Sequence, residues 1–374
     1  MLGLTKDQGT IMKDISGLVR SVNGYLGWNK ARASCFVHML IALFAVKTVN
    51  LKEIAIAFPS SSKVDSRYRR LQRFFALFKI DFVQIARWIF SIFFKPGDKF
   101  YLVIDRTNWY WGKQKINVFM LGIAYEGMAI PLFWKLLPKA GNSNFKEQKE
   151  LITLFIEHFG TKCIQGLLAD REFASGKLLK WLNKQRIFFY IRIKEGTVVY
   201  IKKRKFLNAK KLFNHLQPKS QSVYNMSIWI FGQKVYLAGS RSERGELMIV
   251  ATNHMKPRNA ISIYLRRWEI ENLFQGLKGR GFSFEDTHIT QLDRLAKLIS
   301  LLSIGFVWAH KVGEWKATIK PIIWKQFKGQ KRPQYSYFRY GLDFIRETIL
   351  CLNCKFSQLK QCFSFITPIM EFKS

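Results

Sequence analysis

The stretch Tyr264-Leu-Arg-Arg267-Trp-Glu-Ile-Glu271-Asn-Leu-Phe-Gln-Gly-Leu-Lys278 combines chemically active side chains with an apolar stripe. On an α-helix with about 100° per residue, Tyr264, Arg267, Glu271 and Lys278 fall within one stripe about 60° wide. The apolar residues gather beside it, and they are Ile263, Ile270, Leu273, Phe274 and Leu277. Glu269 points to the opposite side. One carboxylate framed by two cations and a phenol predicts a metal-binding acid that meets a polyanion.

The charge of the chain indicates what the polyanion is. The 374 residues include 61 Lys and Arg against 25 Asp and Glu, for a formal net charge of +36. An excess this large indicates an anionic partner, either nucleic acid or an acidic membrane surface. Because the cations occur along almost the whole chain, extended contact with the phosphate backbone of a nucleic acid is favoured over a polybasic membrane anchor.

The remaining composition favours a cytoplasmic protein. The first residues, Met1-Leu-Gly-Leu-Thr-Lys6, carry no secretory signal pattern. The apolar run 298–309 is shorter than the roughly 18 residues of a membrane span, so it predicts a buried helix. Cys351, Cys354 and Cys362 lie close in sequence, but no neighbouring residue offers a fourth zinc ligand at matching spacing. Free, reduced thiols are the favoured interpretation and a metal site is the alternative.

The order of apolar segments predicts the fold class. Strands are expected at 99–105, 116–126, 129–137, 163–170 and 187–193, with helices at 144–159 and 176–183 between them. This order is that of an α/β protein with an RNase H-like core. Segments at 197–202, 222–231, 233–240 and 246–252 then form a β-rich stretch before the helix that contains Tyr264.

These patterns divide the chain into five parts. We expect a helical region at 1–95, the first part of the RNase H-like core at 96–194 and a β-rich insertion at 195–259. The second part of the core follows at 260–312. The basic, aromatic segment 313–374 is expected to serve oligomerisation or DNA contact.

A cationic helix face in the first region is a candidate for phosphate contact. A polar break at 60–66 precedes a predicted helix, and four arginines lie on that helix: Arg67, Arg69, Arg70 and Arg73. A solvated helix surface is the alternative. The lack of acidic partners four residues away favours binding to DNA phosphates.

Three acidic residues form the candidate catalytic set. Asp105 and Asp170 each close an apolar strand, and Glu271 lies on the helix stripe. A single strand-end Asp could instead cap the following turn. Carboxylates on adjacent rigid elements can hold two Mg²⁺ or Mn²⁺ ions about 3.5–4 Å apart, and such ions activate a hydroxyl and stabilise the leaving oxygen in phosphodiester cleavage. We therefore predict a two-metal phosphodiester chemistry at Asp105, Asp170 and Glu271.

With these residues the chain resembles the DDE transposases of bacterial insertion-sequence family four, the branch that includes the Tn-five and Tn-ten enzymes. The family pattern is Tyr, two residues, Arg, three residues, Glu, six residues, Lys, and Tyr264, Arg267, Glu271 and Lys278 match every position. Two further segments resemble those around the family's first and second Asp, namely Val103-Ile-Asp105-Arg-Thr and Leu167-Leu-Ala-Asp170-Arg-Glu-Phe. The resemblance covers roughly residues 100–311 and includes a β-rich insertion before the Glu.

The resemblance implies cut-and-paste movement of a DNA element. Asp105, Asp170 and Glu271 would bind the metal ions, while Tyr264, Arg267 and Lys278 would hold phosphates at the DNA ends. The helical region 1–95 would be the part that binds those ends. It implies a nick by water, attack of the freed 3′-hydroxyl on the other strand to give a hairpin, reopening, and transfer into target DNA. The implied partners are double-stranded DNA, as terminal inverted repeats and target, and a second copy of the chain in a homodimeric synaptic complex. The implied location is the bacterial cytoplasm, at the nucleoid.

Further residues keep two interpretations each. Trp229 is the one Trp of the predicted insertion, and it either stacks on a base flipped out of the DNA or packs in the core. Arg171 either touches DNA or forms a surface ion pair. Structural roles are favoured over catalytic ones for four others: Glu172, Glu285, Asp286 and His288. The alternatives for the whole chain are a stand-alone RNase H-like nuclease and an inactive DNA-binding relic of a transposase.

Overall fold

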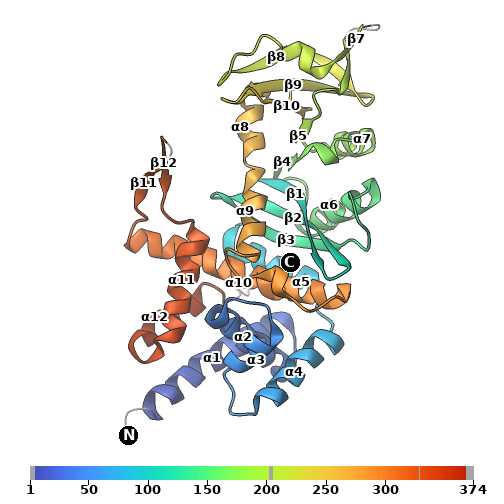
Figure 1. The fold of residues 1–374 in the computed structure, drawn as a ribbon. Helices are drawn as coiled ribbons and strands as arrows, with labels where there is room; N and C mark the ends of the chain where they lie inside the picture. Colours follow the sequence, from blue (N-terminus) through green and yellow to red (C-terminus); the bar gives the residue numbers. More distant parts are fainter. Residues whose placement is uncertain (1–4, 202–204, 328, 368–374) are drawn as a thin grey trace. The chain divides into compact units, whose positions relative to one another are not determined.

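A computed structural model describes residues 5–201, 205–327 and 329–367 of the chain (Figure 1). The chain forms two compact units. The first, which we call the helical unit, comprises Met1–Lys95, Trp109–Ile116 and Phe274–Ser374. The second, the sheet unit, comprises Pro96–Asn108 and Asn117–Leu273.

The helical unit is built from helices at both ends of the chain. Its N-terminal helices are α1 (Thr5–Leu26), α2 (Lys30–Val46), α3 (Leu51–Ala57), α4 (Val64–Leu77) and α5 (Phe82–Phe93). Its C-terminal helices are α10 (Leu292–Ile319), α11 (Tyr337–Leu350) and α12 (Leu352–Ser364). Asn29, Asn50 and Asp81 begin α2, α3 and α5 by accepting hydrogen bonds from backbone N–H groups of the first turn.

Helix α10 is the core of the helical unit. By length and composition it could cross a membrane, but 83% of its most apolar stretch is buried inside the protein. That burial identifies a core helix, as the sequence predicted for residues 298–309. Glycines let α11 cross it closely. A Cβ atom at Gly313 would overlap the carbonyl oxygen of Tyr337, and one at Gly341 would overlap that of Ala309.

A mixed sheet of ten strands dominates the sheet unit. The strands lie in the order β3-β2-β1-β4-β5-β10-β9-β8-β6-β7. Strands β1 and β4 are parallel, as are β4 and β5, whereas β2–β3, β5–β10 and the later neighbours are antiparallel. The bounds are β1 (Phe100–Trp111), β2 (Gln114–Tyr125), β3 (Met128–Leu136), β4 (Ile164–Ala169), β5 (Phe189–Ile193), β6 (Val198–Ile201), β7 (Lys205–Asn208), β8 (Gln221–Ile230), β9 (Gln233–Arg241) and β10 (Leu247–Thr252).

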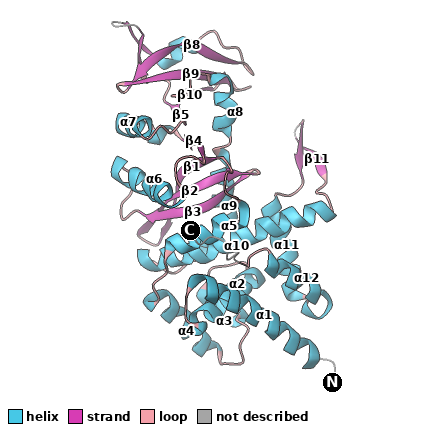
Figure 2. Cartoon of the chain, turned by 180° about the vertical axis from the view of Figure 1, so that it is seen from behind, coloured by secondary structure: helices cyan, strands magenta, loops and turns pink. Residues whose placement is uncertain are grey.

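Helices cover both sides of this sheet. Helices α6 (Phe145–Phe159) and α7 (Gly176–Lys184) lie on one side, and α8 (Ala260–Leu265) lies on the other (Figures 1 and 2). A capping box between Asn144 and Glu147 begins α6, because each side chain bonds the backbone N–H of the other residue. Helix α9 (Trp268–Leu277) follows α8 after a turn at Arg266 and Arg267.

The predicted α/β order from β1 to β5 is confirmed, including both helices between the strands. The helix expected over Tyr264–Lys278 is wrong as one continuous element. Backbone bonds of the shorter i to i+3 type, such as Arg267 N to Tyr264 O at 2.8 Å and Ile270 N to Arg267 O at 3.1 Å, tighten the chain into a turn between α8 and α9. Strand β1 also continues through Asp105 to Trp111, so Asp105 does not end it.

Residues 195–259 contribute strands β6–β10, and these extend the sheet beyond β5. Strand β7 was not predicted from the sequence. In the C-terminal segment, which the sequence left unassigned, β11 (Trp324–Phe327) and β12 (Gln330–Pro333) pair as a separate two-stranded hairpin.

Candidate active site

Strand register brings Asp105 and Asp170 side by side. The parallel pairing of β1 with β4 runs to Ile104 opposite Ala169, and the next residue on each chain is the aspartate. Adjacent strands lie about 4.8 Å apart, so the two carboxylates leave the sheet as neighbours. Asp170 precedes the short 3₁₀ turn Arg171–Phe173 without capping it through its side chain. The Asp170 carboxylate therefore does not serve as a cap for the turn that follows β4.

The turn between α8 and α9 joins a third acid to this pair. Arg267 Nη1 donates to Asp105 Oδ2 at 3.0 Å, and Arg267 Nη2 donates to Glu271 Oε1 at 2.6 Å. The Tyr264 hydroxyl donates to Asp170 Oδ1 at 3.3 Å. The Arg267 guanidinium lies 5.8 Å from the centre of the Tyr264 ring, so these two sets of contacts adjoin and form one network around the three acids. The two side chains that hold them are the Tyr and Arg of the motif.

Burial has the largest single effect on the pKa values of Asp105, Tyr264 and Arg267. It raises the pKa of Asp105 to about 6, against the opposing effects of the Arg267 guanidinium and the Arg106 backbone N–H. Burial also raises the pKa of Tyr264 to about 12, so its hydroxyl keeps its proton and stays a donor. For Arg267, burial would lower the pKa, but Tyr264, Glu271 and Asp105 outweigh it and raise the pKa. This buried cation compensates two carboxylates.

The donor set suits a hard divalent cation. Carboxylate oxygens are the ligands that Mg²⁺ and Mn²⁺ prefer, and the Arg267 guanidinium already bridges Asp105 and Glu271 as a positive group. Within residues 5–201, 205–327 and 329–367, no three His, Cys, Asp or Glu side chains lie close enough to hold one ion as they stand. A shift of the Arg267 guanidinium away from the acids would release both carboxylates for a cation.

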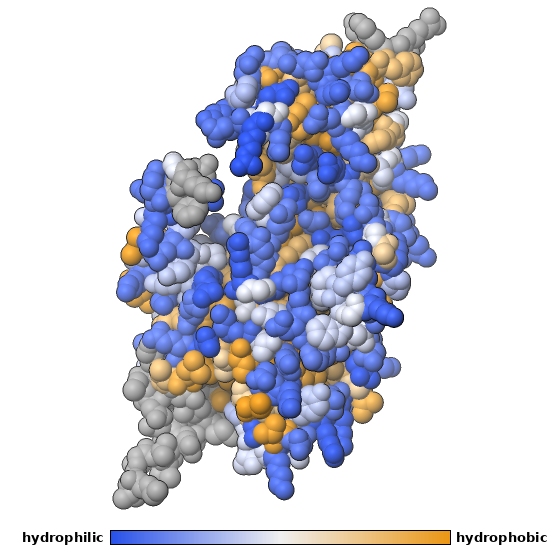
Figure 3. Space-filling model, viewed as in Figure 1, coloured by the Kyte–Doolittle hydropathy of each residue, from blue (hydrophilic) through white to orange (hydrophobic). Residues whose placement is uncertain are grey.

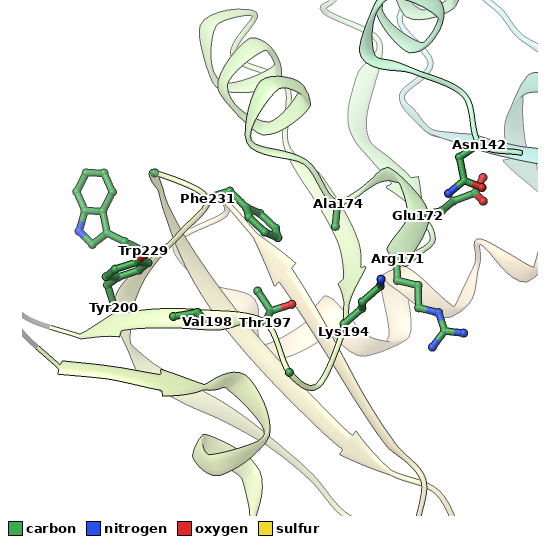
Figure 4. Close-up of a pocket in the computed structure, with 12 residues that line it drawn as sticks. Asn142, Arg171, Glu172, Ala174, Lys194, Thr197, Val198, Tyr200, Trp229 and Phe231 are labelled. Carbon is green, nitrogen blue, oxygen red and sulfur yellow. The ribbon is translucent and has the colours of Figure 1, made fainter.

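A groove in the sheet unit begins beside Asp170. It encloses about 1500 Å³, and its lining runs from Arg171, Glu172 and Lys194 to Tyr200, Trp229 and Phe231. Figure 4 shows Trp229 and Tyr200 at one end, Phe231 facing the middle, and Arg171 and Lys194 at the other end. Trp229 is 50% exposed, which contradicts the alternative that it packs in the core, whereas its contact with a base stays a prediction. Exposed aromatics at one end and cations at the other suit a nucleotide with its phosphate.

Lys278 lies one residue beyond α9, in the helical unit. Its ammonium forms an ion pair with Glu285 at 2.7 Å and lies 5.2 Å from the centre of the Trp109 ring. Within the same unit, the His288 ring packs on Trp111 with 4.6 Å between centroids, and Asp286 ends the short turn Phe284–Asp286. These contacts agree with structural roles for Glu285 and His288.

The four arginines of α4 differ in their contacts. Arg67 donates to the carbonyl oxygens of Ala55, Ile56 and Phe58, which end α3. Arg70 donates to the carbonyl of Ala31 and packs on the Phe58 ring. Arg69 and Arg73 are exposed. Their side chains are the accessible part of the predicted cationic face, whose contact with DNA stays a prediction.

Sequence reasoning missed several residues of this region. Lys194, Tyr200 and Phe231 line the groove, and Arg106 binds Glu172 at 2.6 Å. In the sequence, Arg106 and Glu172 were marked only by their opposite charges and their positions next to Asp105 and Asp170. Hydrophilic side chains cover most of the face seen in Figure 3, as expected for a chain of net charge +36.

Comparison with protein families identifies the family of the chain. Residues 97–308, which contain Asp105, Asp170 and Glu271, match a protein family described as transposase DDE domain. No curated protein matches the chain. Among solved structures, the cryo-EM structure of a piggyBac transposase synaptic complex with hairpin DNA is similar at 13% identity and a TM-score of 0.46. That similarity covers 97% of this chain and 84% of the other.

Proposed function

Because this chain belongs to the family of transposase DDE domains, we propose that it moves a DNA element by cut-and-paste transposition. As a transposase, it is an enzyme that cleaves DNA and transfers strands. The observation that supports the finer proposal is the single network of Asp105, Asp170, Glu271, Tyr264 and Arg267. It joins every acid of the candidate set to the motif's Tyr and Arg.

Transposases of this family use divalent metal ions, and we propose two Mg²⁺ or Mn²⁺ ions held by Asp105, Asp170 and Glu271. When bound, the ions would lower the pKa of the attacking hydroxyl and stabilise the leaving oxygen. The chain's own residues orient the acids. Tyr264 fixes one oxygen of Asp170, and the two strands fix the direction of both aspartates.

The two cations of the motif have separate roles in this proposal. Arg267 offers a planar fork that fits a phosphate with two parallel hydrogen bonds, whereas Lys278 offers a point charge. We propose that Arg267 moves from Asp105 and Glu271 to a phosphate at the element end when DNA and metal ions bind. Arg171, at the mouth of the groove, would contact the same strand.

Hairpin formation requires a sharp bend in the DNA end, which displaces a base from the stack. We propose that the groove receives this base and that Trp229 stacks on it, with Lys194 and Arg171 near its phosphate. Trp229 lines the groove and is half exposed, so its ring is accessible to a base, and stacking on aromatic rings is a general way to hold unpaired bases.

The remaining parts of the chain would bind and pair the ends. We propose that the N-terminal helices read the inverted repeats, with Arg69 and Arg73 on phosphates, and that residues 195–259 act as an insertion in an RNase H-like core. Two copies would join two element ends in a synaptic complex in the bacterial cytoplasm.

The experiment uses the full chain, Mg²⁺ and a duplex carrying one end of the element that encodes it. We expect a nick at the end of the inverted repeat, followed by a hairpin and by joining to a target plasmid. Cleavage of equal rate on a duplex with a scrambled end would contradict transposition and favour a stand-alone nuclease. Binding without any cleavage would favour an inactive relic.

A further inference from the structure

Arg106 and Glu172 form a two-pronged ion pair beside the candidate acids. Arg106 Nε lies 2.8 Å from Glu172 Oε1, and Arg106 Nη2 lies 2.6 Å from Glu172 Oε2. The two side chains are only 9% and 22% exposed. Arg106 directly follows Asp105, and Glu172 is two residues beyond Asp170. The pair therefore ties together the segments that carry the two aspartates.

The Arg106 guanidinium is fully occupied. Besides Glu172, it donates to Asn117 Oδ1 at 3.3 Å, to the Gly141 carbonyl at 2.6 Å and to Asn142 Oδ1 at 2.7 Å. These five bonds use all five N–H groups of a guanidinium. In this arrangement Arg106 has no donor left for a DNA phosphate, so it acts as a fixed brace and not as a DNA contact.

The Arg106–Glu172 ion pair lies just beyond the point where the pairing of β1 with β4 ends. The β1–β4 pairing ends at Ile104 and Ala169, and after Ala169 the chain turns away into Arg171–Phe173. Ladder hydrogen bonds therefore join β1 to β4 before the aspartates but not after them. The Arg106–Glu172 pair joins the two segments at residues that follow both aspartates in sequence. With the ladder on one side and the ion pair on the other, the separation of the carboxylates is defined.

We propose that Arg106 and Glu172 are positioning residues that set the separation of Asp105 and Asp170 and, through it, the affinity for divalent cations. The proposal rests on the proposed function of those acids. A metal site must keep its ligands within about 0.5 Å of the productive geometry, and groups that orient ligands affect metal affinity without touching the ion. In the alternative, Glu172 is itself a ligand, and Arg106→Lys would then leave the affinity for divalent cations unchanged.

The test measures Mn²⁺ binding to the full chain without DNA, from the electron paramagnetic resonance signal of free Mn²⁺. The variants are Glu172→Gln, which loses the charge, Arg106→Lys, which keeps it but loses the fork, and the double variant. Glu150→Gln breaks an ion pair with Lys135 elsewhere in the sheet unit and is the matched control. Thermal unfolding of each metal-free variant checks its fold.

We expect each single variant to bind Mn²⁺ roughly 10- to 100-fold more weakly. The double variant should be no weaker than the weaker single variant, because both act through one pair. The control should bind like the wild type. Strand cleavage by the single variants should return at high Mn²⁺, which a general loss of folding would not allow.

Three outcomes would overturn the inference. If both variants bind Mn²⁺ as the wild type does, the pair has no positioning role, while the proposed function stands. If Glu172→Gln loses affinity and Arg106→Lys keeps it, Glu172 is itself a ligand. If the wild type binds no Mn²⁺, the proposed metal-binding role of the three acids is wrong, and the positioning role is wrong with it. Should Glu172→Gln not fold, Arg106→Lys still decides whether the fork matters.

A separate observation concerns the β11–β12 hairpin of the helical unit. Residues 315–342 hold seven Lys and Arg and no Asp or Glu. The strand register places Lys325 directly opposite Arg332, so both strands carry a cation at this position of the hairpin. A two-stranded hairpin is only marginally stable in water to begin with. Trp324 on the same hairpin is 58% exposed.

We infer that this hairpin is a β-ribbon that enters a groove of duplex DNA. The proposal again rests on the transposase function and is independent of the Arg106–Glu172 pair. The major groove is about 12 Å wide and admits a two-stranded ribbon. The cations on both strands match the phosphates that flank it. The exposed Trp324 gives the ribbon an apolar surface for sugar or base edges.

The test is the salt dependence of affinity for a duplex, measured with Lys325→Ala combined with Lys331→Ala. The slope of log K against log salt should fall by about 2, since each lost phosphate contact accounts for about 0.9. Lys149→Ala combined with Lys162→Ala removes two exposed cations from the sheet unit as a control. An unchanged slope would refute the inference, and a loss of self-association in sedimentation would assign the hairpin to a second copy instead.

Discussion

The Arg267 guanidinium donates to the carboxylate of Asp105 at 3.0 Å across 162 residues of sequence. Arg267 is a residue of the turn between α8 and α9, and Asp105 is on β1, so this contact closes the candidate site. The same guanidinium also binds Glu271. One cation thus compensates two acids before any metal ion binds.

Replacing Arg267 with Gln should destabilise the metal-free protein. The side chain is 8% exposed, and its loss leaves Asp105 and Glu271 without their cation. We expect the free energy of unfolding to fall by about 3 kcal/mol in chelator, from the penalty for leaving charges buried and unpaired. Mg²⁺ should restore a large part of it. Urea unfolding with and without Mg²⁺ measures both effects.

Arg266→Gln is the matched control, because Arg266 pairs with Glu269 outside this network. Its unfolding should show the same small response to Mg²⁺ as the wild type. Equal stability of Arg267→Gln and the wild type in chelator would mean that Arg267 does not compensate the two acids.

The accessible arginines of α4 should carry the DNA contact of that helix. Changing Arg69 and Arg73 to Gln together should reduce the salt slope of affinity for the element end by about 2. Fluorescence anisotropy at several salt concentrations measures it. An unchanged slope would exclude α4 from phosphate binding.

Arg67 should instead affect the fold. Its guanidinium caps the end of α3 through three carbonyl oxygens, and hydrogen bonds from charged groups contribute about 1.5–3 kcal/mol. Arg67→Gln should therefore lower the unfolding free energy by an amount in that range, as read from denaturant curves. Wild-type stability with a flattened salt slope would show that Arg67 acts on DNA and not on α3.

Trp229→Ala should leave stability nearly unchanged, because the side chain is half exposed. Stacking on a base contributes about 1–3 kcal/mol, so binding of a pre-formed hairpin end should weaken roughly five- to 150-fold. Phe188→Ala, at another exposed aromatic of the sheet unit outside the groove, serves as control. Equal binding by both variants and the wild type would remove Trp229 from the groove's function.

Local patterns were sufficient to predict most of the central sheet. The strand–helix order from β1 to β5 follows from apolar runs and helical spacing, which are local signals. Two features depended on tertiary context. Most residues of β1 beyond Asp105 are only partly buried, although they continue the strand. The i to i+3 bonds at Arg267 interrupt the expected helix. Strands β11 and β12 carry cations and little apolar pattern, so their sequence gave no strand signal.

The three acids and the motif were identifiable because their spacing is specific. Their partners were not, since pairing Arg106 with Glu172 or Arg267 with Asp105 requires the register of β1 and β4 and the position of α8. The arginines of α4 show the same limit. Their identical charges gave no indication that Arg67 and Arg70 bind backbone carbonyls while Arg69 and Arg73 are exposed.

The most direct test of the central claim is the strand-cleavage rate of Glu271→Gln with Mg²⁺ and a duplex bearing the element end. Glu269→Gln, an isosteric change on the same helix at an acid that pairs with Arg266, is the control. Residues that only orient a metal ligand account for about 10- to 100-fold, so loss of a ligand should slow cleavage by more than about 100-fold. The control should cleave at close to the wild-type rate. Wild-type cleavage by Glu271→Gln would contradict the assignment of Glu271, Asp105 and Asp170 as the catalytic acids.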